Sequence, residues 1–366
     1  MLDLIMSEKK FWKKIKNNRF YLALAGIIGA ILLFIMVLYL AVPSYSFADI
    51  EPFNGDFIYN PYSEINRINY FDFRSQSIEN QGVNAYEYGY AVTGTRYLCL
   101  GYKSKRKIDY PFLQSIHYKQ FNIDKLNKKC RLVAPAHPSK GFKKGEMTRL
   151  DHYRVMEALS HDDNSLYYWD IALSNGHRVN IIATGPNFVT ACIGDNDAES
   201  VYKSLETGNS YAVAYHGRLA EVPELQEVAM NNDTLKVVVS AIAKEIRFIG
   251  QNAIVKQSVN DVAEAKYHFD KDDTYIRTEI EFYDGNILYL NPLVRHQYQF
   301  FFDLNKAKVM KGRTYLMWAV YIIVVLAYVR FVISAGAKRN GDLSLRKHSP
   351  LVNKSQIINE YENSGK

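Results

Sequence analysis

Two long stretches without any charged residue constrain this chain more than any other feature of its sequence. One lies between Arg19 and Asp49 and the other between Arg313 and Arg330. A bilayer-spanning helix needs about 20 mostly apolar residues, because it rises about 1.5 Å per residue and the hydrocarbon core is about 30 Å thick. The two stretches therefore predict a membrane protein with a large domain between two spans.

The first predicted span covers 20–42, which are 23 uncharged and mostly apolar residues. A cleaved signal peptide is the alternative, since several lysines within 1–19 precede the span and Ser46-Phe47-Ala48 resembles a cleavage site. The apolar core of a signal peptide is only about 7–15 residues long, however. We therefore expect a transmembrane helix.

The second predicted span covers 315–335 and contains one charged residue, Arg330, near its end. A long arginine side chain in that position reaches the membrane interface while its stem stays in the apolar region. The alternative is an intramembrane contact between Arg330 and a partner. We expect the interfacial placement.

The net charge of +7 is confined to the flanks of the two spans. Residues 1–19 carry +4 and residues 336–366 carry +3, whereas residues 20–335 hold 33 basic and 33 acidic side chains. Basic flanks mark the cytoplasmic side, so we expect a cytoplasmic N-terminus, a cytoplasmic tail and, in a bacterium, an inner-membrane protein with a periplasmic domain. The neutral middle argues against a nucleic-acid partner and leaves the lipid bilayer as the expected one.

The three cysteines, Cys99, Cys130 and Cys192, are too few for a disulfide scaffold. An oxidising compartment would permit one bridge, and the spacing does not say which pair forms it. Three buried thiols that pack as small apolar groups are the other interpretation.

Residues 48–220 alternate short apolar runs with longer amphipathic segments, a pattern typical of α/β folds. Helices are predicted over 111–126 and 198–207, and Gly208 is a stop signal for the second. The pattern predicts an α/β layer or barrel. The predicted strands are Tyr70–Phe73, Tyr97–Leu100, Arg131–Ala136, Val155–Leu159 and Arg178–Ala183.

Residues 221–300 change to β-rich runs separated by turn residues. Asp284-Gly285 between two apolar runs is a strong hairpin signal. This part of the chain therefore predicts a small antiparallel β-sandwich domain that packs on the first.

The sequence contains no P-loop, GxGxxG, GxSxG or HExxH motif. Several segments across about 58–295 nevertheless resemble, in their order and flanking sequence, the PHP family of metal-dependent phosphoesterases (polymerase and histidinol phosphatase). That resemblance implies a distorted β/α barrel. The segments are IYNPYSEINRINYFDFRSQS, RLVAPAHP, YWDIALSNGHRVNIIATG, FIGQN and TYIRTEIEF with YLNP.

In that family, His-x-His, Asp-His, a His before Pro and a late Asp-x-His follow successive strands and hold two or three divalent ions. Here the first pair falls on Arg74 and Gln76, and the second on Tyr102 and Lys103. The late pair falls within 185–188, which offers no such ligands. Most of the metal ligands that the resemblance implies are therefore replaced.

Only His137, before Pro138, and Glu157 keep a ligand-capable side chain at matching positions. Arg74 and Lys103 would place fixed positive charges where the family holds cations, at a cost of a few kcal/mol for each like-charge contact. One His and one Glu are also fewer than the three protein ligands of a catalytic zinc. The resemblance thus implies a catalytically degenerate member that uses no cofactor.

Each residue of this predicted pocket has a structural interpretation as well as a binding one. His137 is a core histidine or a remnant ligand, and Glu157 binds something or forms an ion pair with Arg74 or Lys103. The two cations in turn suit a phosphate or carboxylate ligand.

The sequence therefore predicts a two-pass membrane protein whose degenerate PHP-like domain is a binding or scaffold subunit of an envelope protein complex. A metal-dependent hydrolase with a rearranged site of His137, Glu157 and Asp170 is the alternative. An anion sensor built on Arg74 and Lys103 is a third possibility. Trp169 and Asp170 themselves are predicted to be structural.

Overall fold

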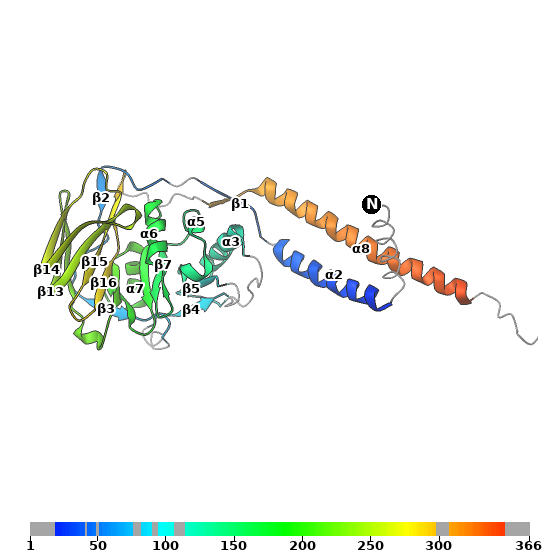
Figure 1. The fold of residues 1–366 in the computed structure, drawn as a ribbon, viewed down its shortest axis with the longest axis horizontal. Helices are drawn as coiled ribbons and strands as arrows, with labels where there is room; N and C mark the ends of the chain where they lie inside the picture. The colour runs from blue at the N-terminus through cyan, green and yellow to red at the C-terminus, as the bar shows by residue number, and fades with distance from the viewer. Residues whose placement is uncertain are drawn as a thin grey trace, which may run out of the picture. The chain divides into compact units, whose positions relative to one another are not determined.

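The computed structural model describes residues 19–40, 42–48, 51–75, 82–89, 94–105, 114–297 and 307–347 (Figure 1). The chain divides into two compact units. One consists of the terminal segments, 1–41 and 311–366, and the other of residues 42–310.

The terminal unit contains two helices, α2 (Arg19–Leu40) and α8 (Lys311–Lys347). Among the side chains that the structure describes, one stretch is long and apolar enough to cross a membrane, Lys311–Phe331 in α8. In α2 the apolar stretch that qualifies is Gly26–Met36, which is too short by itself. The structure thus supplies one candidate span where the sequence predicts two, because the side chains at both ends of α2 lie outside the described set.

Glycine allows α2 and α8 to approach closely. The hydroxyl of Tyr328 donates a hydrogen bond to the backbone carbonyl of Gly26 at 3.2 Å. A Cβ atom at Gly29 would collide with the Tyr328 ring, so only glycine fits there. Large apolar side chains of α8 are exposed at Tyr315, Leu316, Val320, Ile322, Ile323, Val324, Leu326, Val329, Phe331 and Ile333.

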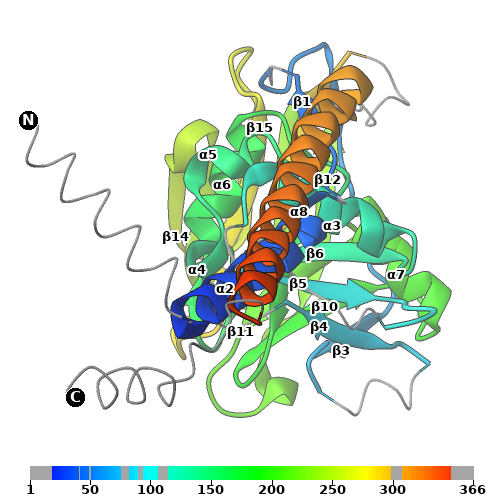
Figure 2. The same ribbon diagram turned by 90° about the vertical axis from the view of Figure 1, so that its right-hand side faces the viewer.

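A six-stranded mixed sheet forms one layer of the larger unit. Its order is β4-β5-β6-β7-β8, with β9 paired to β7, and Figure 2 shows β4, β5 and β6 side by side. Among the described strands of this sheet, only the pairs β6–β7 and β7–β9 run parallel. The strands are β4 (Ala85–Tyr88), β5 (Arg96–Leu100), β6 (Leu132–Ala136), β7 (Val155–Ser160), β8 (Asp163–Asn164) and β9 (Asn180–Thr184).

Helices and strands cover both faces of this sheet. Alternation in β5 sends Tyr97 and Cys99 into a core shared with helices α3 and α6, and Leu98 and Leu100 into a core shared with helix α7 and strands β3 and β10. The sheet therefore lies between two apolar cores. The helices of this unit are α3 (Ile116–Asn127), α4 (Pro138–Gly141), α5 (Lys144–Met147), α6 (Leu166–Ser174) and α7 (Ala198–Thr207), with 3-10 turns η2 (Leu219–Glu221) and η3 (Gln251–Ala253).

A ten-stranded antiparallel sheet forms the second large layer. Its main path is β12-β13-β15-β16-β11-β10-β3, with β14 paired to β13, β17 to β15, and β2 to β17. The long hairpin of β13 and β14 is prominent in Figure 1. The strands are β2 (Phe57–Tyr59), β3 (Ile68–Phe71), β10 (Phe188–Ile193), β11 (Ser210–Ala214), β12 (Leu225–Asn231), β13 (Thr234–Gly250), β14 (Ile254–His268), β15 (Tyr275–Glu281), β16 (Ile287–Leu290) and β17 (Leu293–His296).

The ten-stranded sheet crosses the domain boundary that the sequence predicts near residue 220. Strand β11, before the boundary, pairs with β16, after it, through Tyr211 with Leu290 to Ala214 with Ile287. Strands from both sides also share one apolar core. The strands expected to form a separate small sandwich therefore extend a sheet that starts earlier in the chain.

A short two-stranded ribbon lies near both ends of this unit. Strands β1 (Tyr45–Phe47) and β18 (Ala307–Val309) pair antiparallel. Tyr45 anchors the ribbon to α3, since its hydroxyl donates to Asp124 at 2.7 Å and its backbone N–H donates to His117 Nδ1 at 3.0 Å. The two segments that adjoin α2 and α8 in the chain are thus held together.

The α/β class is confirmed, and the closed barrel is not. Within the described ranges the strands form separate open sheets. A β/α barrel needs parallel neighbours, but β5 runs antiparallel to β6, and β3 joins the antiparallel sheet through β10. Local signals succeeded better: helix 198–207 and its stop at Gly208 (φ +88°) are as predicted, and Asp284-Gly285 turns β15 into β16.

Candidate functional site

The candidate site lies where the carboxyl ends of parallel strands meet. His137 directly follows β6, Glu157 is on β7, and Thr184 ends β9. Alternation puts Glu157 and Thr184 on the same sheet face as Val155 and Ile182, which belong to the core next to α7. Ligand sites of α/β sheets form at this edge, so the fold gathers these polar groups where chemistry would be expected.

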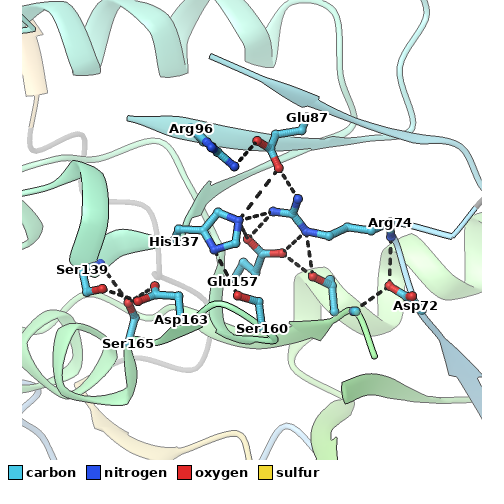
Figure 3. Close-up of polar contacts among 12 residues, drawn as sticks. Asp72, Arg74, Glu87, Arg96, His137, Ser139, Glu157, Ser160, Asp163 and Ser165 are labelled. Atoms are coloured by element: carbon cyan, nitrogen blue, oxygen red, sulfur yellow. Dashed lines mark hydrogen bonds and ion pairs between the residues drawn. The ribbon is translucent and has the colours of Figure 1, made fainter. Parts of the chain in front are cut away.

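The guanidinium of Arg74 is at the centre of this group (Figure 3). Its Nε and Nη2 atoms donate to the two carboxylate oxygens of Glu157 at 2.7 and 2.8 Å, and Nε also lies 3.0 Å from Thr184 Oγ1. Nη1 donates to Glu87, and Nη2 lies 2.8 Å from Nε2 of His137. We call Arg74, Glu87, His137 and Glu157 the Arg74 cluster.

Arg74 reaches the cluster from the other sheet, three residues after β3. The Asp72 carboxylate accepts the backbone N–H groups of Arg74 at 3.0 Å and of Gly185 at 2.9 Å, which fixes the loop. On the opposite side, Arg96 Nη1 lies 3.0 Å from Glu87. The side chains of Arg74 and Arg96 therefore balance those of Glu87 and Glu157.

Pairing outweighs burial in the electrostatics of Arg74. Burial alone would lower the pKa of the guanidinium, but the hydrogen bonds and charges of Glu157 and Glu87 raise it above its ordinary value. The Glu157 side chain has no exposed surface and directs its oxygens at Arg74 and Thr184. The cluster is a satisfied, buried ion pair with an exposed rim rather than a free cationic pocket.

His137 is neutral in this arrangement. Arg74 can only donate, so Nε2 of His137 must accept, and the ring proton then belongs to Nδ1, which lies 3.0 Å from Ser160 Oγ. Burial lowers the pKa of His137, and the carboxylates of Glu157 and Glu87 only partly offset this. Because Nδ1 holds the proton, His137 cannot take one from Ser160, and the pair does not form an activated nucleophile.

The backbone at His137 is strained. Its φ of 46° and ψ of 57° are left-handed, a conformation that costs a non-glycine residue about 1–3 kcal/mol, and the following Pro138 restricts it further. The contacts of the ring with Arg74 and Ser160 offset that cost.

The lowered pKa of His137 predicts acid sensitivity. In the unfolded chain His137 takes up a proton near pH 6.5, whereas in the folded protein it stays neutral to a lower pH. The contribution of His137 to the free energy of unfolding is therefore fully retained above pH 6.5 and decreases as the pH falls below that value. His137→Gln keeps an acceptor for Arg74 without a titrating group. We expect urea unfolding midpoints of the variant to fall less between pH 7.5 and 5.5 than those of the parent. Equal falls would mean that His137 is protonated in the folded state.

The cluster does not fit the metal centre that the PHP resemblance implies. Over the described parts of the chain, no three His, Cys, Asp or Glu side chains are arranged to hold a metal ion. Glu87, His137 and Glu157 each direct an acceptor atom at the Arg74 guanidinium instead. A protein cation thus takes the place that a metal bound by these residues would need.

A second polar group beside the cluster is structural. Asp163 accepts hydrogen bonds from the hydroxyls of Ser139 and Ser165 (Figure 3). Ser165 in turn accepts the backbone N–H of Ser139 at 2.8 Å. These bonds tie the start of α4 to the β8–α6 turn and leave Asp163 occupied.

The structure brings three of the predicted pocket residues together, Arg74, His137 and Glu157, and separates two others. Tyr102 and Lys103 follow β5, which runs antiparallel to β6, so they lie at the strand end opposite to His137. Lys103 is exposed, and its backbone pairs with Lys129. The predicted placement of Tyr102 and Lys103 in the pocket is therefore wrong.

Two further predicted positions are Gln76, from the first pair, and the late ligand segment 185–188. Gln76 lies outside the described residues. Within 185–188, Gly185 takes part only through its backbone N–H to Asp72. Glu87, Arg96, Asp72, Ser160 and Thr184 were not predicted, and the alternating pattern of β4 was the one signal for Glu87.

Asp170 does not join the cluster. Its carboxylate forms a buried two-pronged ion pair with Arg277, at 2.7 and 2.8 Å, and accepts from the Tyr275 hydroxyl at 3.3 Å. Asp170 is therefore engaged with Arg277 and is not assembled with His137 and Glu157 into the rearranged hydrolytic set.

Comparison of the chain with protein-family models, with curated proteins and with solved structures finds no match in any of the three.

Proposed function

We propose that this chain is a membrane-anchored, catalytically inactive PHP-like protein that acts as a binding or scaffold subunit of an envelope complex. The observation that carries the proposal is the Arg74 cluster, in which one guanidinium forms ion pairs with two carboxylates and occupies the lone pair of an imidazole. Such a group offers no free ligand to a metal and no free general base to a reaction, so we assign it a structural role.

Membrane attachment is the second part of the proposal. The exposed apolar side chains of α8 suit a lipid environment, and the span Lys311–Phe331 has the required length. With α2 as a second span and basic flanks on both, the larger unit would be periplasmic in a bacterium. Two tethers would keep it at the membrane surface, where its effective concentration for neighbouring proteins is high.

Metal content and turnover of the purified full-length protein test the absence of catalysis. We expect elemental mass spectrometry to find less than about 0.1 metal ion per chain after incubation with Mn²⁺ and Zn²⁺ and removal of excess, and no cleavage of bis-p-nitrophenyl phosphate above buffer. His137→Ala should behave identically in both assays. Stoichiometric metal and turnover that both disappear in His137→Ala would establish the rearranged hydrolase instead.

A further inference from the structure

Two of the three cysteines lie next to each other in the structure. Cys99 is on β5, and Cys130 lies two residues before β6, the antiparallel neighbour of β5. The Cys99 thiol is a hydrogen-bond partner of the Cys130 thiol, and both side chains belong to the same apolar core. Both are in the reduced, thiol form in this structure.

A glycine explains why the two side chains share a face. Cys99 pairs with Val133, so strict alternation back along the next strand would send Cys130 to the opposite face of the sheet. Gly101 adopts a left-handed conformation with φ of 64°, and Arg131 donates to the carbonyls of both Leu100 and Gly101 there. Alternation ends at this point, and Cys130 packs beside Cys99.

The two thiols differ in access and in charge environment. Cys99 is fully buried, whereas Cys130 retains 7% exposure. The hydrogen bond from Cys99 lowers the pKa of Cys130 against the opposing effect of burial, and the Tyr86 hydroxyl and the Lys129 charge add to the lowering. Cys130 is therefore the thiol that becomes a thiolate and attacks first.

The third cysteine provides the contrast. Cys192 lies on β10, in the core that contains α7, and burial raises its pKa to about 12. A hydrogen bond with the hydroxyl of Ser204 lowers this pKa only in part. Cys192 is thus an inert core thiol.

We propose that Cys99 and Cys130 form an intramolecular disulfide when the protein meets a disulfide oxidant. The Cys130 thiolate attacks one sulfur of the oxidant, forms a mixed disulfide and releases one thiol. Cys99 then attacks the sulfur of Cys130, the mixed disulfide breaks, and a second thiol leaves. Two electrons pass from the cysteine pair to the oxidant, and the two cysteine protons end on the released thiols.

Oxidation of the purified full-length protein tests the pair without reference to its location. After incubation in oxidised glutathione, denaturation and alkylation, we expect one reactive thiol instead of three, and a peptide linking Cys99 to Cys130 by mass spectrometry. Cys192→Ser should still form the link, and Cys99→Ser and Cys130→Ser should not. The oxidised protein should melt about 5 °C or more above the reduced one, because the bridge closes a loop of about 30 residues. Three alkylated thiols after native oxidation, or a link to Cys192, would overturn the proposal.

The same measurement in cells separates this inference from the proposed periplasmic location. Acid quenching followed by alkylation should find the pair oxidised if the larger unit is periplasmic. If the disulfide forms in the test tube but the pair stays reduced in cells, the disulfide proposal is supported and the periplasmic location is contradicted. If the pair stays reduced in both, only the disulfide proposal is overturned.

Discussion

Replacing Arg74 by alanine should lower the free energy of unfolding of the larger unit by about 3 kcal/mol. The substitution removes both donors from the carboxylate of Glu157, which has no exposed surface, and leaves it buried with Thr184 as its remaining polar contact. It also removes the partner of Nε2 in the strained His137. The side chain of Arg74 is 27% exposed, so water partly compensates, and the expected loss is at the lower end for a broken buried pair.

Divalent metal should reverse much of that loss in Arg74→Ala. The variant would leave Glu87, Glu157 and the Nε2 lone pair of His137 around a small cavity, with Nε2 3.9–4.0 Å from an oxygen of each carboxylate. These are ligand types that Zn²⁺ and Mn²⁺ accept. At a metal concentration about 100 times its Kd, the linkage relation gives about 2.7 kcal/mol of stabilisation. Urea unfolding over a metal concentration series measures it.

Two controls define this experiment. Arg96→Ala removes a guanidinium that also contacts Glu87 but is 30% exposed, and it should cost less than about 1 kcal/mol and give no metal response. Arg74→Ala combined with His137→Ala should lose the metal response. If metal stabilised the parent protein as much as Arg74→Ala, the guanidinium would not be standing in for a cation.

The elements of the fold could be predicted from local patterns, but their pairing could not. The apolar runs before His137 and at Glu157 gave strands β6 and β7 nearly to the residue, and Gly208 gave the end of α7. An alternating strand looks the same in a parallel and an antiparallel neighbourhood, however. The sequence therefore could not exclude a barrel, and it could not indicate that β11 pairs with β16 far along the chain.

The same limit on predicting strand pairing explains which residues of the candidate site were predicted correctly. His137, Glu157 and Arg74 were predicted because they match motif positions of the PHP family, and all three do lie at or after strands that meet at the site. Lys103 was misplaced because β5 runs the other way. Glu87 and Arg96 reach the site from the paired strands β4 and β5. Because β5 runs antiparallel to β6, Arg96 at its start lies beside the end of β6, and Lys103 after its end lies far from it. The direction of one strand thus accounts for the misplaced Lys103 and for two of the missed residues, Glu87 and Arg96.

Asp170→Ala should lower the free energy of unfolding by about 3–5 kcal/mol, the largest effect that we expect from a single substitution. Asp170 on α6 and Arg277 on β15 each expose 3% of their surface, and their two hydrogen bonds join the helix to the ten-stranded sheet. Arg277 also contacts Glu279 at 2.5 Å and lies over the ring of Trp169. Removal of Asp170 would leave a buried guanidinium with one carboxylate.

Removing both partners of this pair should cost much less than removing Asp170 alone. In Asp170→Leu combined with Arg277→Met, no buried charge is stranded, because Glu279 keeps its contact with Arg247 at 2.9 Å. A double-mutant cycle by urea unfolding should therefore give a coupling of about 3 kcal/mol. Arg67→Ala breaks an exposed pair with Asp195 and should cost less than about 1 kcal/mol. If the double variant were as unstable as the sum of the single ones, the two side chains would act separately, and α6 would be held to the sheet by its apolar face alone.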